Sequence, residues 1–430
     1  MNTMIALAIT ASLLVAPKLP ASGESQPSPE WLSTQRAIAL AISQDPYLNG
    51  SEFAEQAFRD QAVAQSFRPD PRLTVSAANF PVDSFDFGQE PMTQLMLSVS
   101  QVLPRGDSLA LRNQRELSQA AQQPLLREDR RASVTLAVTE LWLSIYQAEQ
   151  SITLIETDRG LFDQLVDAAE LGYASGLMRS AQQDLIRAQL EVTAIEDRLT
   201  NLRQQRDSAR QRLSEWVGPI AVDSELGPLS PSADPVSPNA PMLRSHPLLR
   251  ATDAEIAALE TDVDLARQSA KPEWMISAQY GLRGEAPDGR DRADFLSLGV
   301  SVDLPWFRRQ RSDHQVSAAA GRAEAKRSDY ALRLRQLSAR WATAQSDLAR
   351  IIERQALYER TLLPQMHELA DAAINAYNND EGEFAEAVRA RIAELNAKIE
   401  LLNIVVQRHR IHAQIAYLAT SSEQNTGSEP

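Results

Sequence analysis

The feature that most constrains this chain is a pair of long helical patterns separated by one short turn. Residues 108–173 and 177–216 carry apolar side chains at alternating spacings of four and three, interrupted only by Arg159 in the first segment and Arg206 in the second. This spacing is typical of a coiled-coil seam, and two seams joined by a tight turn predict an antiparallel helical hairpin. If continuous, the first helix would be about 100 Å long at 1.5 Å per residue, far longer than a globular domain requires.

Composition excludes several classes of protein. A mean hydropathy of −0.32 argues against a bundle of membrane-spanning helices. The one long apolar run, residues 4–16, is too short to span a membrane and is followed by Pro17, Pro20 and Ala21. We interpret residues 1–21 as a secretory signal peptide, an ordinary apolar amino terminus being the alternative. The mature chain is therefore expected to be exported.

The charge balance and the lack of cysteine limit which partners and which bound groups the chain can have. Asp and Glu number 57 against 43 Lys and Arg, a net charge of −14, which disfavours nucleic acid as a partner. There are no cysteines, so disulfides, thiolate metal sites and a lipid-bearing amino-terminal cysteine are excluded.

Ahead of the long helical segments the periodicity changes from helical to two. After two short helical patterns, residues 31–43 and 48–64, apolar and polar side chains alternate over residues 72–80 and 94–103. This alternation predicts two strands. Residues 22–218 therefore form one unit of two strands and a helical hairpin at 108–217, and six prolines in residues 219–244 mark a linker.

The same order of elements recurs after the linker. Pro46, Pro71 and Pro104 are matched 201 positions later by Pro247, Pro272 and Pro305. The second unit, residues 245–420, is predicted to contain strands at 273–282 and 294–304 and a helical hairpin at 308–418, with a disordered tail at 421–430. Pro124 and Pro364 fall inside long helical patterns and are expected to kink or interrupt them.

Four amphipathic strands are too few for a complete structure. Strands of about ten residues with one apolar face are typical of an outer-membrane barrel wall, but four strands cannot close a barrel. Open sheet edges are not tolerated in hydrocarbon, so other copies of the chain must pair with them. The helical hairpins are likewise fragments of a tube, and a cyclic homo-oligomer completes both.

This duplicated order resembles the TolC-like outer-membrane efflux factors, over about residues 31–419. The resemblance implies a mostly α-helical fold with a membrane β part: a homotrimer with a twelve-stranded β-barrel in the outer membrane, continued into the periplasm by a twelve-helix α-barrel. It also implies a periplasmic adaptor, or membrane fusion protein, and an inner-membrane RND-type pump as partners. Five stretches resemble the heavy-metal efflux branch: residues 69–72, 79–81, 85–88, 100–106 and 271–274.

The turns of the two hairpins are the candidate functional sites. By resemblance they form the periplasmic mouth, with Tyr173, Gly176, Tyr377 and Gly382 in the adaptor-docking tips, although plain helix–helix turns would have the same composition. Asp380, Glu381 and Glu383 make the second tip acidic. Threefold symmetry would place nine carboxylates around one opening, a field that favours cations; a solvated acidic turn at a helix amino terminus is the alternative.

No motif indicates catalysis or a cofactor. Nucleotide-binding, metalloprotease and serine-hydrolase motifs are absent from the sequence. His409 and His412 are spaced to share a metal but have no third ligand nearby in the sequence, and His367 is a weaker candidate, so no metal site is predicted. We therefore expect a non-enzymatic, passive duct.

The sequence interpretation is a passive outer-membrane exit duct of a tripartite efflux system, exporting heavy-metal cations. Two alternatives stay open. A soluble periplasmic coiled-coil adaptor or structural protein would explain the seams but not the four strands, and a duct for drugs or secreted polypeptides would differ only in cargo.

Overall fold

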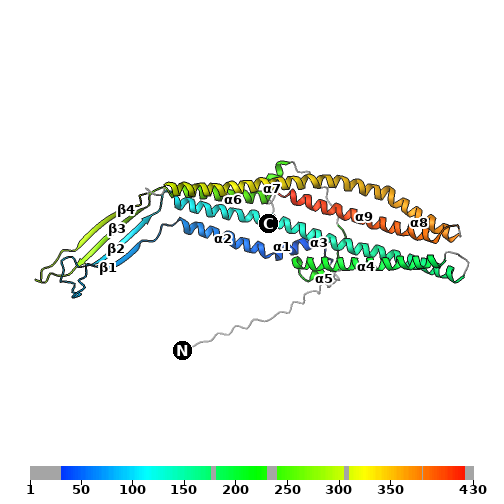
Figure 1. Cartoon of the computed structure of the whole chain (residues 1–430), viewed down its shortest axis with the longest axis horizontal. Coiled ribbons are helices and arrows are strands. Elements are labelled where there is room, and N and C mark those ends of the chain that lie inside the picture. Colours follow the sequence, from blue (N-terminus) through cyan, green and yellow to red (C-terminus); the bar gives the residue numbers. More distant parts are fainter. Residues whose placement is uncertain (1–30, 176–180, 230–239, 305–308, 380, 422–430) are drawn as a thin grey trace, which may run out of the picture.

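The chain forms a long, mostly helical body with a single antiparallel sheet at one end (Figure 1). The computed structural model describes residues 31–175, 181–229, 240–304, 309–379 and 381–421. In Figure 1 the sheet lies at the left, and the described helices of the two hairpins extend to the opposite end. Among the described helices, none carries an apolar stretch that is long enough to cross a membrane.

Each repeat begins with the same helix start. In α1 (Thr34–Gln44) the cap is Ser33, and α2 (Pro46–Ser66) starts with Pro46 after the Asp45 side chain, which accepts a hydrogen bond from the backbone N–H of Tyr47. The counterpart of α2, α6 (Pro247–Gln268), starts with Pro247 after His246, whose Nδ1 accepts from the backbone N–H of Leu248 at 3.3 Å. A proline at the first helical position and an acceptor before it fix both starts.

The first long hairpin consists of α3 (Ser108–Ser175) and α4 (Ala181–Val217). Pro124 does not interrupt α3, contrary to one of the two expected outcomes. A proline costs a helix interior about 3 kcal/mol, and this part of α3 is packed between α2 and α6. Tertiary packing therefore outweighs the local preference.

The second hairpin is divided where the first is continuous. It contains α7 (Arg309–Leu357), a π-helical turn η2 (Tyr358–Leu362), α8 (Leu363–Asn378) and α9 (Phe384–Leu418). This interruption agrees with the expectation that Pro364 would kink or interrupt its helical pattern. Pro364 lies in the first turn of α8 and lacks the N–H of a normal helix interior, and the chain widens to a π-turn immediately before it.

The helices form one layer of four columns. Near the sheet the neighbours run α2, α3, α6, α7, and near the hairpin turns they run α4, α3, α9 and then α7 with α8. Thus α2 and α4 share one outer column, α6 and α9 share an inner one, and the long α3 and α7–α8 are columns by themselves. Buried seam residues between the columns form the core, including Val138, Ile145, Ile155, Leu199 and Ile399.

Two short elements lie between the first hairpin and α6 in the chain. Gly218, at φ +75°, ends α4, and α5 (Ile220–Asp223) follows within the predicted linker; a short 3-10 helix η1 (Ala240–Ser245) precedes α6. Leu226 forms a parallel bridge with Leu32, so the linker also pairs with the start of the first repeat.

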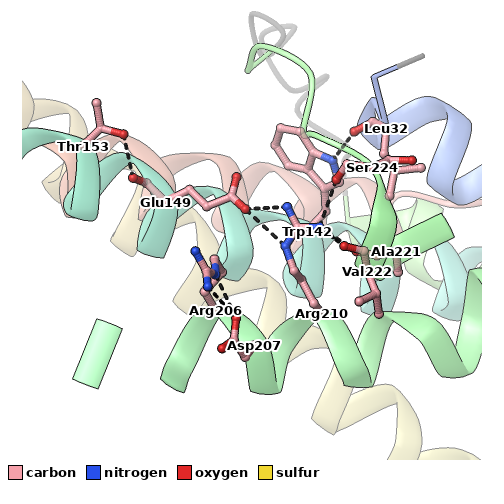
Figure 2. Close-up of polar contacts among 10 residues, drawn as sticks. All are labelled: Leu32, Trp142, Glu149, Thr153, Arg206, Asp207, Arg210, Ala221, Val222 and Ser224. Atoms are coloured by element: carbon pink, nitrogen blue, oxygen red, sulfur yellow. Dashed lines mark hydrogen bonds and ion pairs between the residues drawn. The ribbon is translucent and has the colours of Figure 1, made fainter. Parts of the chain in front are cut away.

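Polar contacts fasten α1 and α5 to the first hairpin (Figure 2). The indole N–H of Trp142 in α3 donates to the Leu32 carbonyl at 2.8 Å. The Arg210 guanidinium of α4 donates to the carbonyls of Ala221, Val222 and Ser224 at 2.9–3.0 Å and binds the Glu149 carboxylate at 2.6 Å. Arginine can satisfy several acceptors at once because its donors are arranged as a rigid fork.

The sheet is antiparallel in the order β1–β2–β3–β4. Its strands are β1 (Arg72–Ala78), β2 (Gln94–Leu103), β3 (Trp274–Arg283) and β4 (Phe295–Val302). The central pair, β2 and β3, joins the two repeats, which leaves β1 and β4 as the outer strands.

Candidate functional site

The sheet has one apolar and one polar face, and the strand register makes each face continuous. One row across all four strands consists of Val75, Leu97, Tyr280 and Leu296, and the next row consists of Thr74, Ser98, Gln279 and Ser297. The third row is apolar again: Leu73, Val99, Ala278 and Leu298. Successive residues of a strand point to opposite faces, so hydroxyl and amide side chains gather on one face and hydrocarbon on the other.

The apolar face is not covered by the rest of the chain. Leu298 is 79% exposed, Leu296 70% and Val300 67%, and apolar residues of the other three strands on this face are exposed as well. A continuous exposed apolar surface of this kind indicates contact with a partner or with lipid. It includes Leu97 and Val99 of β2 and Leu298 and Val300 of β4.

Both edges of the molecule are open within the described part of the chain. In those residues β1 pairs only with β2 and β4 only with β3, so each has a free row of backbone donors and acceptors. The outer helical columns also expose large apolar side chains, among them Phe53 of α2, the cap residue Phe67 that follows it, and Leu332 and Leu357 of α7. Sheet and helical layer are therefore incomplete at the same two sides.

The second hairpin tip is a tight turn built around Gly382. The backbone N–H of Glu381 donates to the Ala376 carbonyl at 2.9 Å, which closes the end of α8. A Cβ on Gly382 would lie 3.0 Å from the Ala376 Cβ and from the Tyr377 nitrogen, so only glycine fits without displacement. The Tyr377 and Phe384 rings meet edge to face, with centroids 5.5 Å apart.

The structure brings four of the predicted tip residues together: Tyr377, Glu381, Gly382 and Glu383. Glu381 and Glu383 are both exposed. Glu383 is the cap residue of α9, but its side chain makes no capping hydrogen bond there, so the carboxylate stays available to solvent. Asp380 and Gly176 lie outside the described residues, and for Tyr173 only the helical backbone of α3 is described.

Sequence reasoning missed a charged cluster farther from the tip, where α8, α9 and α3 meet. Glu394 of α9, whose side chain is 2% exposed, binds the Arg391 guanidinium at 2.6 Å, His367 Nδ1 of α8 at 3.0 Å and Lys398 Nζ at 3.2 Å. Lys398 also reaches Asp158 of α3 at 3.2 Å. The cluster therefore ties α3, α8 and α9 together.

The protonation of Glu394 follows from these partners. Burial favours the neutral carboxyl, but the hydrogen bonds from His367 and Lys398 and the charges of Lys398 and Arg391 outweigh it, so the pKa of Glu394 is lowered. Glu394, at i+3 from Arg391 and i–4 from Lys398, was visible in the sequence as a charged helix face. Its burial was not, because it depends on where α8 crosses α9.

The histidines considered as metal ligands have other roles. His409 Nδ1 lies 2.9 Å from the Val405 carbonyl of its own helix, His412 is buried, and His367 belongs to the Glu394 cluster. Among the described residues, no group of three or more potential ligands is placed to hold a metal ion.

Comparison with known proteins places this architecture among outer-membrane channels. No protein-family model matches the chain. Over 155 residues it is 27% identical to the multidrug resistance outer membrane protein MdtP of Shigella flexneri and of Escherichia coli; this is 35% of this chain and only 31% of the relative.

Solved structures agree over much more of the chain. The outer membrane protein VceC of Vibrio cholerae matches with a TM-score of 0.75 at 18% identity, covering 90% of this chain and 96% of VceC. The outer-membrane channel OprN matches at 0.74 and 17% identity, with 91% and 90% covered. CusC, described as forming a transmembrane channel, matches at 0.74 and 12% identity, with 90% and 92% covered. The chain thus has the TolC-like channel fold, as its sequence predicted.

Proposed function

We propose that this chain is one third of a passive exit duct in the bacterial outer membrane, extending into the periplasm and working in a tripartite efflux system. The observation that carries the proposal is the four-stranded sheet with one lipid-compatible face and two open edges. It continues into a helical layer whose outer columns are exposed on the same two sides.

Closure by symmetry accounts for these open edges. If β4 of one copy pairs with β1 of the next, three copies give a twelve-stranded barrel, and four helical columns per copy give a twelve-column tube. Every edge strand then has a partner, as hydrocarbon requires. The apolar rows face lipid and the serine-rich rows face the lumen. The signal peptide at residues 1–21 would supply the export that this location needs.

The hairpin tips would be the periplasmic mouth. We assign Tyr173, Gly176, Tyr377 and Gly382 to the surface that meets a periplasmic adaptor, which connects the duct to an inner-membrane pump of the RND type. The likeness in fold to OprN, VceC and CusC supports this arrangement. The duct itself has no nucleotide-binding motif, so the pump must supply the energy.

Disulfide trapping tests the assembly on a clean background, because the chain has no cysteine. A cysteine replaces Ser76 in β1, and a second replaces Ser297, Gly299 or Ser301 in β4. In outer-membrane fractions, oxidation of one of these pairs should give linked dimers and trimers and nothing larger, since a ring of three is closed. Recovery of an unlinked monomer by osmotic shock would instead support the periplasmic adaptor alternative.

The acidic tip points to cations as cargo, and heavy-metal cations remain our interpretation. Asp380, Glu381 and Glu383 would contribute nine carboxylates to the mouth of a trimer. Replacing all three by Asn or Gln should lower the cation-over-anion permeability ratio of single channels in a planar bilayer. An unchanged permeability ratio would refute the cation-filter hypothesis. Drugs are the competing cargo, because the relative MdtP is named a multidrug resistance protein.

A further inference from the structure

A positively charged groove, opposite in sign to the acidic tip, lies between α3, α4 and α9. It is in the half of the helical layer that is farther from the sheet. Its volume is about 670 Å³, which is within the usual range for sites that hold a small organic molecule. Three arginines line it: Arg198 and Arg212 of α4 and Arg410 of α9. The groove's other lining residues, all in the described part of the chain, are amides, serines and aliphatic residues, and none carries a carboxylate.

Two of the three arginines have neutral hydrogen-bond partners. Arg410 donates to the Ser144 hydroxyl at 3.0 Å and to the Gln147 side-chain oxygen at 2.9 Å, and Arg198 donates to the Asn396 side-chain oxygen at 2.7 Å. Elsewhere on α4, Arg203 binds Glu156 and Arg210 binds Glu149. The groove arginines therefore keep more of their positive charge available than other arginines of the same helix.

Two carboxylates lie close to the groove without lining it. Glu140 acts electrostatically on Arg410, and Glu400 accepts a hydrogen bond from the lining residue Asn403 but is paired with Arg354. Burial lowers the pKa of the Arg410 guanidinium, and Glu140 offsets only part of that effect. The positive charge of the groove is thus incompletely balanced within the chain.

The groove is on the face of the layer opposite α1 and α5. In a helix, residues two positions apart differ by about 200° in direction. On α3, the groove residue Ser144 is two positions after Trp142, which binds the Leu32 carbonyl just before α1. The groove residue Ser151 is two positions after Glu149, which binds Arg210, the arginine that holds α5. Likewise, Ser208 and Arg212 of α4 flank Arg210.

This orientation decides what the groove meets in the assembled duct. In a closed tube of twelve columns, α1, α5 and the linker would obstruct the lumen if they lay inside, so they belong outside. The groove then opens to the lumen, and this step rests on the proposed function. A substrate moving from the acidic mouth toward the barrel would pass it.

We propose that the groove binds an organic anion, a molecule with an apolar body and two or more carboxylate, sulfonate or phosphate groups. Arg212 and Arg410 bind the anionic groups from opposite walls, and Ala148, Leu202 and Ile399 provide the apolar floor. Arg198 lies 14 residues before Arg212 on α4, about 21 Å along the helix, so the positive charge extends along the groove. The duct then presents an acidic mouth and a basic groove in series.

Calorimetry on the purified full-length protein in neutral detergent tests this proposal. The probe is naphthalene-1,5-disulfonate, and the matched cation is 1-naphthylmethylammonium. The wild type should bind the disulfonate and not the cation. Arg212→Gln should weaken disulfonate binding by about tenfold, the loss expected for one charge-assisted hydrogen bond. Arg212 is exposed, so this change leaves the core intact.

The control is Arg203→Gln, which removes the same charge from the other side of α4 and should leave the affinity unchanged. No binding by the wild type, equal loss in both variants, or equal affinity for the cation would each overturn the proposal. Conductance of the same preparation in a bilayer tests the exit-duct proposal separately from anion binding by the groove. A conducting trimer that does not bind the probe refutes the groove, whereas a chain that binds the probe but forms no channel refutes the duct.

Discussion

A charge placed on the apolar face of β2 should prevent assembly, whereas the same charge one residue further along should be tolerated. Leu97 is 45% exposed and lies between Val75 and Tyr280 in an apolar row of the sheet. Ser98 lies between Thr74 and Gln279 in the polar row. Both are near the middle of a ten-residue strand, and β2 is an inner strand, so neither change touches an edge.

The expected magnitude follows from the depth of the residue in the membrane. Arginine on the lipid face near the bilayer midplane costs about 2–4 kcal/mol per chain, which is roughly a 30-fold to 1,000-fold change in an equilibrium constant. A trimer carries the cost three times. In Leu97→Arg the heat-resistant trimer should therefore disappear from the outer-membrane fraction. In Ser98→Arg the side chain enters the aqueous lumen, and the trimer should remain.

The assay is the ratio of trimer to total protein in outer membranes, read from unheated and heated gel samples of both variants at equal expression. Trimer recovery from Leu97→Arg equal to that from Ser98→Arg would show that this face does not meet lipid. The lipid-facing assignment and the barrel would then both be wrong.

Two further predictions concern buried titratable side chains in the helical layer. Burial lowers the pKa of His246 below its ordinary 6.5, so the unfolded chain binds a proton that the folded chain does not, and stability should fall as the pH drops below 6.5. His246→Asn keeps an acceptor for the Leu248 N–H and should reduce this slope in urea unfolding at pH 5–7; an unchanged slope would contradict the assignment. Glu394→Gln removes the buried carboxylate from Arg391 and Lys398, although Lys398 keeps Asp158, and should destabilise the helical layer by about 1–3 kcal/mol, measured by urea unfolding of the same protein. Exposed Glu353→Gln, which removes only a surface pair with Arg350, should cost less than about 1 kcal/mol, and equal effects would show that the Glu394 cluster has no special role.

Local periodicity was informative wherever one face of an element meets a uniform environment. The strands occur where apolar and polar residues alternate, because a sheet with one apolar and one polar face needs a period of two along its whole length. The four-three spacing predicted the first long hairpin, since a seam repeats the same contact at every turn, and the internal repeat predicted the second. The repeat offset of 201 residues paired Asp45 with His246 as helix caps, although these two residues differ chemically.

Features that depend on contacts between distant segments could not be read in this way. The π-turn before Pro364, the helix that continues through Pro124, and α5 within the proline-rich linker all depend on what packs beside them. The roles of Arg210 and Glu394 were likewise hidden, because a charged residue in a helical pattern looks solvated until another helix is placed over it.

The sequence by itself determined the elements, their order, their duplication and the apolar face of the sheet, because each is fixed by neighbours within a few residues along the chain. Only the tertiary structure decided that α2 and α4 share one column, and that α6 and α9 share another. It also decided which arginines pair with carboxylates and which line an open groove. Those choices are set by the angle and rotation at which helices far apart in the chain meet, and no periodicity in a single helix specifies them.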